Sequence, residues 1–253
     1  MIKKLVPLLA AAERMMVFTG AGVSVDSGIP DFRTPGGIWD RIDPMTLSRS
    51  GAEGSPARRA EFWRAMRSLA DSLGDPKPNA VHHAVVALDQ RGQVGGVVTQ
   101  NIDGLHQAAG STEVIELHAN HLMCHCLGCG DRLPTAEVVA RVRGGEAAPS
   151  CRKCGGIIRP ELVLFEDMLP VDALRRAERL ALSCDLCLVL GSSLVVHPAA
   201  DLPRMARRAG AKLVIATLGP TPIDDWAHLK IDAPLADVFV PAVRKLPRRR
   251  SES

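Results

Sequence analysis

Four short apolar runs divide the chain: MMVFT (15–19), VGGVVTQ (94–100), LCLVLG (186–191) and KLVIAT (212–217). None of them alternates between apolar and polar positions, which is the pattern of strands buried on both faces of a parallel sheet. Helical patterns lie between the runs, at about 57–74, 79–91, 171–182 and 199–209. Because strands alternate with helices, the sequence predicts an α/β fold with a doubly wound parallel sheet.

The first residues, MIKKLVPLLAAAER, combine two lysines with a short apolar stretch, as a signal peptide does. The apolar side chains there also fall on one face of a helix: Ile2, Leu5, Leu8, Leu9 and Ala12. We favour the helix, because the stretch is short and the first strand follows at once. No apolar run approaches the roughly 18 residues that span a bilayer. We therefore expect a cytoplasmic protein without a membrane partner.

Composition argues against a nucleic-acid partner. The net charge is only +3, and aromatic residues make up 3% of the chain, which leaves few platforms for stacking bases. Five of the seven cysteines fall in one short segment rather than in a spread disulfide framework, which also fits a reducing compartment.

The ends of the four apolar runs are polar or rich in glycine. They carry Gly20-Ala21-Gly22, Gln100-Asn101-Ile102-Asp103, Gly191-Ser192-Ser193 and Thr217-Leu218-Gly219. In open parallel sheets, ligands bind outside the carboxyl ends of the strands. The sequence therefore predicts that these four segments share one ligand pocket.

Segment 121–160 interrupts the alternation and contains two CxxC pairs, Cys126 with Cys129 and Cys151 with Cys154. Two such pairs supply the four thiolates of a tetrahedral zinc site, which has no open position for water and is therefore structural. A glycine after each pair, Gly130 and Gly155, is expected to let the backbone turn so that its amides face the sulfurs.

Three other cysteines are weaker candidates. Cys124 could replace Cys126 only through a wider spacing to Cys129. Cys184 and Cys187 have CxxC spacing but enter an apolar run, where residues three apart point to opposite faces of a strand. We interpret all three as small core residues.

The loop GAGVSVDSGIPDFR (20–33) follows the first strand as a dinucleotide fingerprint does, but Val25 stands where the third glycine of G-x-G-x-x-G is expected. With TQNIDGLH (99–106), ELHAN (116–120), the CxxC pairs, IIRPELVLFED (157–167) and GSSLVVHPA (191–199), it resembles the sirtuins, the NAD-dependent protein deacylases. The resemblance covers about residues 14–235.

The resemblance implies a Rossmann-like NAD-binding domain of residues 1–120 and 160–243, a zinc-binding module at 121–159, and an acylated-lysine protein or peptide in the cleft between them. Residues 244–253 would form a basic, disordered tail. The implied products are lysine, nicotinamide and O-acyl-ADP-ribose. NAD is then a co-substrate, and one Zn²⁺ is structural.

The resemblance also assigns the site. NAD would contact Gly20, Ala21, Gly22, Ser24, Asp31, Phe32, Arg33, Trp39, Gln100, Asn101, Ile102, Asp103, Gly191, Ser192, Ser193, Thr217, Leu218 and Gly219. Asn101 and Asp103 would line the nicotinamide pocket, and Asn101 would also serve in catalysis. His118 would be the general base that takes a proton from a ribose hydroxyl. His106 is expected to pack or to cap.

The implied peptide contacts are Val163, Phe165, Val195 and Val196, which would hold the extended peptide between two strands. Alternatively, these four side chains belong to the hydrophobic core. Ala119 and Glu166 stand where sirtuins usually have glycine, and Ala216 where they usually have asparagine. The chain has no tyrosine, so it lacks the Tyr-x-x-Arg pair of desuccinylases, and an apolar acyl group such as acetyl is expected.

Two other functions stay open at this point. Glu166 in the peptide groove would suit an NAD hydrolase or a mono-ADP-ribosyltransferase on the same scaffold. A non-enzymatic zinc module could use the basic segment 244–250 as its contact surface.

Overall fold

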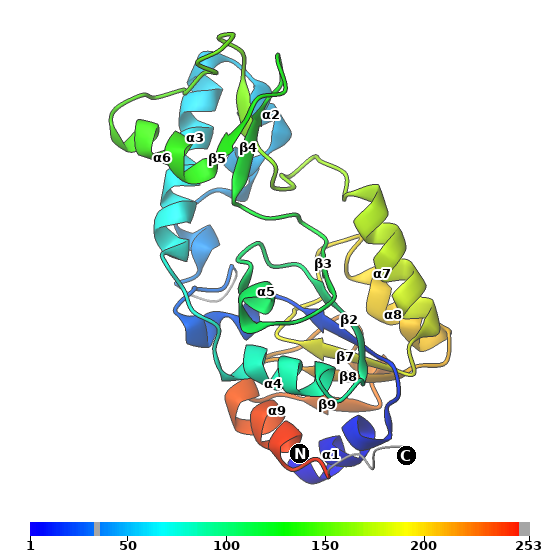
Figure 1. The fold of residues 1–253 in the computed structure, drawn as a ribbon. Coiled ribbons are helices and arrows are strands. Elements are labelled where there is room, and N and C mark those ends of the chain that lie inside the picture. Colours follow the sequence, from blue (N-terminus) through cyan, green and yellow to red (C-terminus); the bar gives the residue numbers. More distant parts are fainter. Residues whose placement is uncertain (33–35, 248–253) are drawn as a thin grey trace. The chain divides into compact units, whose positions relative to one another are not determined.

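The computed structural model describes residues 1–32 and 36–247 (Figure 1). Contacts divide the chain into two compact units. The first comprises Met1–Ser27, Lys77–Leu117 and Val171–Ser253, and the second comprises Gly28–Pro76 and His118–Pro170. The second unit includes the expected zinc module, 121–159, but it also takes in residues 28–76.

In the described part of the first unit, six strands form one sheet in the order β3-β2-β1-β7-β8-β9. Their bounds are β1 Met15–Thr19, β2 Val94–Thr99, β3 Val114–Glu116, β7 Leu186–Leu190, β8 Lys212–Ala216 and β9 Leu229–Ile231. All neighbouring pairs are parallel. The four predicted strands are confirmed as β1, β2, β7 and β8. The order reverses between β1 and β7, and ligands of doubly wound sheets bind at this switch point.

Helices cover both faces of this sheet (Figure 1). One face carries α1 (Ile2–Ala11), α4 (Ala80–Asp89) and α9 (Leu235–Arg244), and the other carries α7 (Val171–Ser183) and α8 (Asp201–Arg208). The short helix α5 (Leu105–Ala109) follows β2. The helices expected at 79–91, 171–182 and 199–209 and at the N-terminus are thus confirmed.

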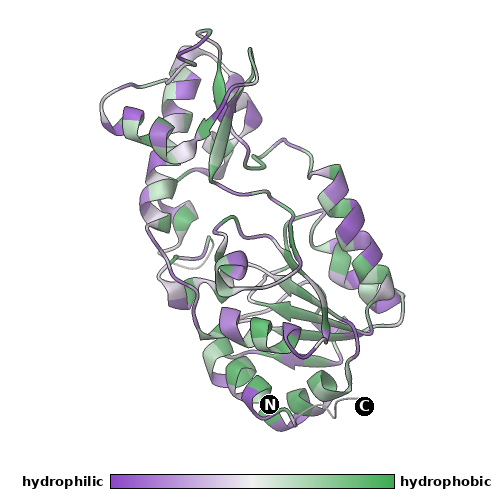
Figure 2. Cartoon of the chain, in the orientation of Figure 1, coloured by the Kyte–Doolittle hydropathy of each residue, from purple (hydrophilic) through white to green (hydrophobic). Residues whose placement is uncertain are grey.

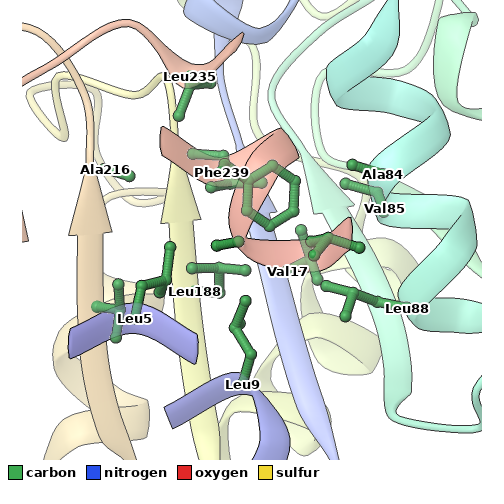
Figure 3. Packing of buried hydrophobic residues seen from close by; sticks show 14 of the residues in the cluster. Leu5, Leu9, Val17, Ala84, Val85, Leu88, Leu188, Ala216, Leu235 and Phe239 are labelled. Carbon is green, nitrogen blue, oxygen red and sulfur yellow. The ribbon is translucent and has the colours of Figure 1, made fainter. Parts of the chain in front are cut away.

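The core of the first unit lies between the sheet and the α1, α4 and α9 helices. Leu9, Leu88 and Phe239, one from each helix, pack toward Val17 and Leu188 of the strands (Figure 3). Most positions in the strands of this sheet are hydrophobic (Figure 2). Burial of such a layer at about 25 cal/mol per Å² is the main stabilising contribution for a sheet of this type.

The second unit contains a small antiparallel sheet with the strand order β5-β4-β6. Its elements are α2 (Arg49–Glu53), α3 (Pro56–Leu73), β4 (Met123–Cys126), β5 (Arg132–Pro134), α6 (Thr135–Arg143) and β6 (Ile158–Pro160), with 3₁₀ turns at Ile38–Asp40 and Pro44–Leu47. The expected helix 57–74 is α3, which buries Phe62 and Trp63.

The chain's end differs from the expected tail. Arg244 still belongs to α9, so the helix extends into the segment 244–253 that the sequence assigned to a tail. Residues 248–253 lie outside the described residues. Among those that are described, none of the helices combines the length and the apolar character needed to cross a membrane.

Candidate functional site

The glycine-rich loop after β1 packs directly against the loop after β7. The Gly22 amide donates a hydrogen bond to the Gly191 carbonyl (2.9 Å). A Cβ added at Gly20 would lie 2.9 Å from the Gly191 oxygen, and one added at Gly22 would lie 2.7 Å from the Gly191 Cα. The structure therefore gives these glycines a reason that the sequence did not supply: they let the two loops at the switch point meet backbone to backbone.

A polar cluster follows from the same loop. Asn101 donates from Nδ2 to the Ser24 hydroxyl (3.1 Å), and that hydroxyl donates to Asp103 Oδ2 (2.7 Å). Asp103 Oδ1 accepts from the Leu105 amide at the start of α5 (2.9 Å). Ser24 and Asn101 are buried. Three residues predicted to contact NAD, from β1 and β2 loops far apart in sequence, are thus in direct contact.

The other predicted NAD residues of the first unit lie at the same edge of the sheet. Gln100 donates from Nε2 to the Ser192 hydroxyl after β7 (2.7 Å). The Gly219 amide after β8 donates to Asp232 Oδ1 (2.9 Å). Ala216 is the last residue of β8 and belongs to the apolar core, so Thr217 is the first polar position after this strand. An asparagine at 216 would be buried in that core.

The predicted loop residues Phe32 and Trp39 belong to the second unit. The Trp39 amide donates to the Phe32 carbonyl (3.1 Å), and their ring centroids lie 5.0 Å apart. The Trp39 ring also lies 5.9 Å from the ring of Phe165, a predicted peptide contact. Asp31 accepts from the Ile38 amide through its carbonyl (2.9 Å). Arg33 lies outside the described residues.

His118, the expected general base, follows β3 and is half-buried in the second unit. Its carbonyl accepts a hydrogen bond from the Val163 amide (3.1 Å), which ties it to the expected peptide segment. Ala119, directly after it, has φ 53°. This left-handed backbone explains why glycine is usual there, since Cβ disfavours this region.

The predicted peptide contacts fall in both units. Val163 and Phe165 lie in the second unit, whereas Val195 and Val196 lie in the first. In the described chain neither pair belongs to a strand; Phe165 forms only an isolated bridge with Ser48. The expected pair of flanking strands is therefore replaced by two irregular segments.

Glu166 has φ 71°, the second left-handed position where glycine is usual. Its carboxylate accepts hydrogen bonds from the Ser50 amide (2.9 Å) and the Ser50 hydroxyl (3.1 Å) in the first turn of α2. A carboxylate in the first turn of a helix satisfies amides that the helix leaves unpaired. Glu166 thus contacts its own unit's backbone.

The four predicted zinc ligands meet in one cluster. The ligand sulfurs of Cys126, Cys129, Cys151 and Cys154 all lie within 4.8 Å of one another. The Cys126–Cys154 and Cys129–Cys151 sulfurs are 3.5 Å and 3.7 Å apart, close to the about 3.8 Å that tetrahedral zinc with Zn–S bonds of about 2.3 Å requires. The donor set and its spacing fit a structural zinc ion.

The backbone around the cluster also fits a metal. Gly130 and Gly155 adopt the expected left-handed turns, with φ 73° and 75°. The amides of Gly128 and Gly156 donate to the sulfurs of Cys126 and Cys154 at 3.3 Å and 3.4 Å. These N–H···S bonds stabilise negative charge on the sulfur atoms.

The cysteines taken as core residues are buried outside this cluster. The Cys124 sulfur lies 3.3 Å from the Thr135 hydroxyl. Cys184 and Cys187 are also buried. In the described part of the chain, the metal-capable group contains none of the three.

Two buried histidines from α4 and α5 pack against each other. His106, expected to pack or to cap, is 1% exposed, whereas no role was expected for His82. His82 and His106 have ring centroids 4.9 Å apart. Burial lowers the pKa of His82 to about 4 and that of His106 to about 3, so both rings are neutral at pH 7. The two histidines lie 24 positions apart in the sequence, so their contact left no local pattern.

Comparison with known proteins places these features in one family. The model of the Sir2 family matches residues 20–198. An NAD-dependent protein deacetylase of Caldivirga maquilingensis is 41% identical over 227 residues, 90% of this chain and 86% of that protein. NAD-dependent protein deacylase 2 of Archaeoglobus fulgidus is 42% identical over 253 residues, 99% of this chain and 98% of that protein.

Solved structures agree with the sequence relatives. A Sir2 variant with a deacetylated p53 peptide and 3′-O-acetyl ADP-ribose is similar to this chain with a TM-score of 0.90 and 39% identity. The match covers 96% of this chain and 97% of that one.

Proposed function

The chain belongs to the Sir2 family, the sirtuins, and we propose that it is an NAD-dependent protein-lysine deacylase, most readily a deacetylase. It removes an acyl group from lysine and yields nicotinamide and O-acyl-ADP-ribose. One observation carries the proposal: the cluster of Ser24, Asn101 and Asp103 lies at the switch point of a chain that matches deacylases over nearly its full length.

NAD is bound at the carboxyl edge of the first unit's sheet. Ser24, Asn101 and Asp103 hold the nicotinamide side, because amide and carboxylate groups pair with a carboxamide. Gln100 and Ser192, already joined by a hydrogen bond, contact ribose and phosphate. The adenosine lies over Thr217, Leu218 and Gly219, and the Gly20–Gly22 turn offers backbone amides to the phosphates.

His118 acts as the general base, since histidine exchanges protons near neutral pH. Its backbone bond to Val163 holds it beside the segment that binds the acylated peptide. Phe32 shields the reacting carbon after nicotinamide leaves, and the contact with Trp39 holds its ring in place. Arg33, from the same loop, stabilises phosphate charge.

The alternative of an NAD hydrolase or ADP-ribosyltransferase rested on Glu166 as a free acidic group in the peptide groove. The bonds of its carboxylate to Ser50 remove that motive, so deacylation remains the function with the best support. We place the protein in the cytoplasm, because its thiols must stay reduced to bind zinc.

The experiment incubates the protein with NAD and peptides carrying acetyl, butyryl, succinyl or long-chain acyl-lysine. Acetyl-lysine should be turned over with formation of O-acetyl-ADP-ribose. His118→Ala should lower the turnover by about 10²–10⁴-fold, the usual contribution of a general base, and should keep NAD binding. His83→Ala, an exposed histidine on α4, is the matched control. Nicotinamide release without any acylated peptide would instead support the hydrolase.

A further inference from the structure

A chain of buried hydrogen bonds runs from His106 to the backbone of Asn101. The His106 Nε2 atom lies 3.0 Å from the Thr19 hydroxyl. Thr19 donates to the Thr99 hydroxyl at 2.8 Å, and the Thr99 hydroxyl accepts from the Asn101 amide at 3.0 Å. All four residues are at least nine-tenths buried. Side chains therefore join β1, β2 and α5 to Asn101, a member of the cluster of Ser24, Asn101 and Asp103.

The direction of these bonds fixes the state of His106. The single proton of Thr19 is used toward Thr99, so the bond between His106 and Thr19 needs a proton on Nε2. A second proton on the ring would place a charge among buried groups, and burial lowers the pKa of His106 to about 3. The ring therefore stays a neutral donor over the whole physiological pH range.

We infer that His106 is a positioning residue for nicotinamide: through Thr19 and Thr99 it fixes the backbone of Asn101 and thereby the cluster of Asn101, Ser24 and Asp103. The backbone amide of Asn101 donates to the Thr99 hydroxyl, and its side-chain amide donates to the Ser24 hydroxyl. Loss of the bonds through Thr99 removes the hydrogen bond to the Asn101 backbone amide and leaves the side-chain contact with Ser24. The inference rests on the proposed function, which assigns nicotinamide to this cluster.

His82 offers a matched control within the same buried pair. It is as buried as His106 and lies against it. Its Nδ1 accepts from the Asn79 amide (3.3 Å) in the cap of α4. Among the described residues, no hydrogen bond joins it to Thr19 or Thr99. Removing its ring should therefore cost stability without loosening Asn101.

The first measurement is inhibition of deacetylation by added nicotinamide. His106→Leu and the nearly isosteric Thr99→Val should each raise the inhibitory nicotinamide concentration about two- to tenfold, the range that one net hydrogen bond covers. The KM for the acylated peptide should stay within about twofold. His106→Gln, whose amide can still donate to Thr19, should restore most of the wild-type sensitivity. His82→Leu should melt at a lower temperature but keep that sensitivity.

The second measurement needs no activity. Amide hydrogen exchange of the segment 99–104 should be faster in His106→Leu and Thr99→Val than in wild type or in His82→Leu. If His106→Leu fails to fold, Thr99→Val alone decides. Exchange and nicotinamide sensitivity that match those of His82→Leu would overturn the positioning role. If the two variants exchange faster but the wild-type protein itself shows no deacylation, the role of His106 in fixing Asn101 stands and the proposed function is rejected.

Discussion

Replacing Gly191 by alanine tests whether the loops after β1 and β7 require a residue without a Cβ atom where they meet. A Cβ there would lie 2.6 Å from both the Gly22 carbonyl carbon and the Val23 nitrogen. These are backbone atoms that no side-chain rotation can move. Gly191 also has φ 60°, where alanine costs about 1–2 kcal/mol. With about 1–3 kcal/mol for overpacking, we expect Gly191→Ala to lower the free energy of unfolding by about 2–5 kcal/mol.

Two further variants separate the causes. Gly92→Ala carries the conformational cost alone, because Gly92 has φ 68° and nothing lies within 4 Å of its added Cβ. A loss of about 1–2 kcal/mol is expected. Gly22→Ala carries the clash alone, because its Cβ would lie 2.7 Å from the Gly191 Cα without a left-handed backbone; about 1–3 kcal/mol is expected.

Urea unfolding followed by circular dichroism gives the three values. The KM for NAD should rise in Gly191→Ala and Gly22→Ala only, since those substitutions push apart the two loops that we propose to bind NAD. The reasoning is refuted if Gly191→Ala costs no more stability than Gly92→Ala, because the close approach of the loops would then carry no energetic weight.

Three further outcomes are expected. Cys154→Ser should lose its zinc, whereas Cys124→Ser should retain one ion per chain. Metal analysis of the purified variants checks both outcomes. Burial holds the pKa of His82 near 4 and of His106 near 3 in the folded state; the unfolded chain therefore binds more protons below pH 6.5, and stability should fall by up to about 1.4 kcal/mol per pH unit and per histidine down to pH 4. Unfolding free energies that stay flat from pH 6.5 to 4.5 would contradict this. Ala119→Gly should raise the melting temperature by relieving a left-handed alanine worth up to about 1 kcal/mol, and a lower melting temperature would argue against strain at that position.

The part of the fold that the sequence predicts is the part that buries its strands on both faces. Strands β1, β7 and β8 each carry four or more consecutive apolar residues. Strand β2 has only valines and glycines before its final threonine, so the pattern of all four strands is local. Strands β3 and β9 have three residues each, too few for a period, and they exist because a neighbouring strand pairs with them. The small sheet of the second unit was missed for the same reason.

Site residues show the same division. The zinc ligands could be predicted because the spacing within each CxxC pair is a local sequence pattern typical of zinc sites. The need for glycine at position 22 could not be predicted, because its partner Gly191 lies 169 residues further along the chain. Only the folded sheet brings the two together. For His106 the sequence predicted only packing or capping. Its bond to Thr19 could not be predicted, because the two residues lie 87 positions apart.

The two positions where this chain departs from the usual sirtuin glycine, Ala119 and Glu166, are both left-handed, with φ 53° and 71°. The fold therefore demands that backbone whatever residue stands there, and each side chain must bear a conformational cost of about 1–2 kcal/mol. Glu166 offsets the cost, because its carboxylate gains two hydrogen bonds to Ser50. Ala119 has no polar group with which to do so. Strain that is not offset at its own residue persists only where surrounding contacts hold it, and here the neighbouring contact is the bond between the His118 carbonyl and Val163. The bond that holds the proposed general base, His118, against the proposed peptide segment thus also helps to hold Ala119 in this conformation.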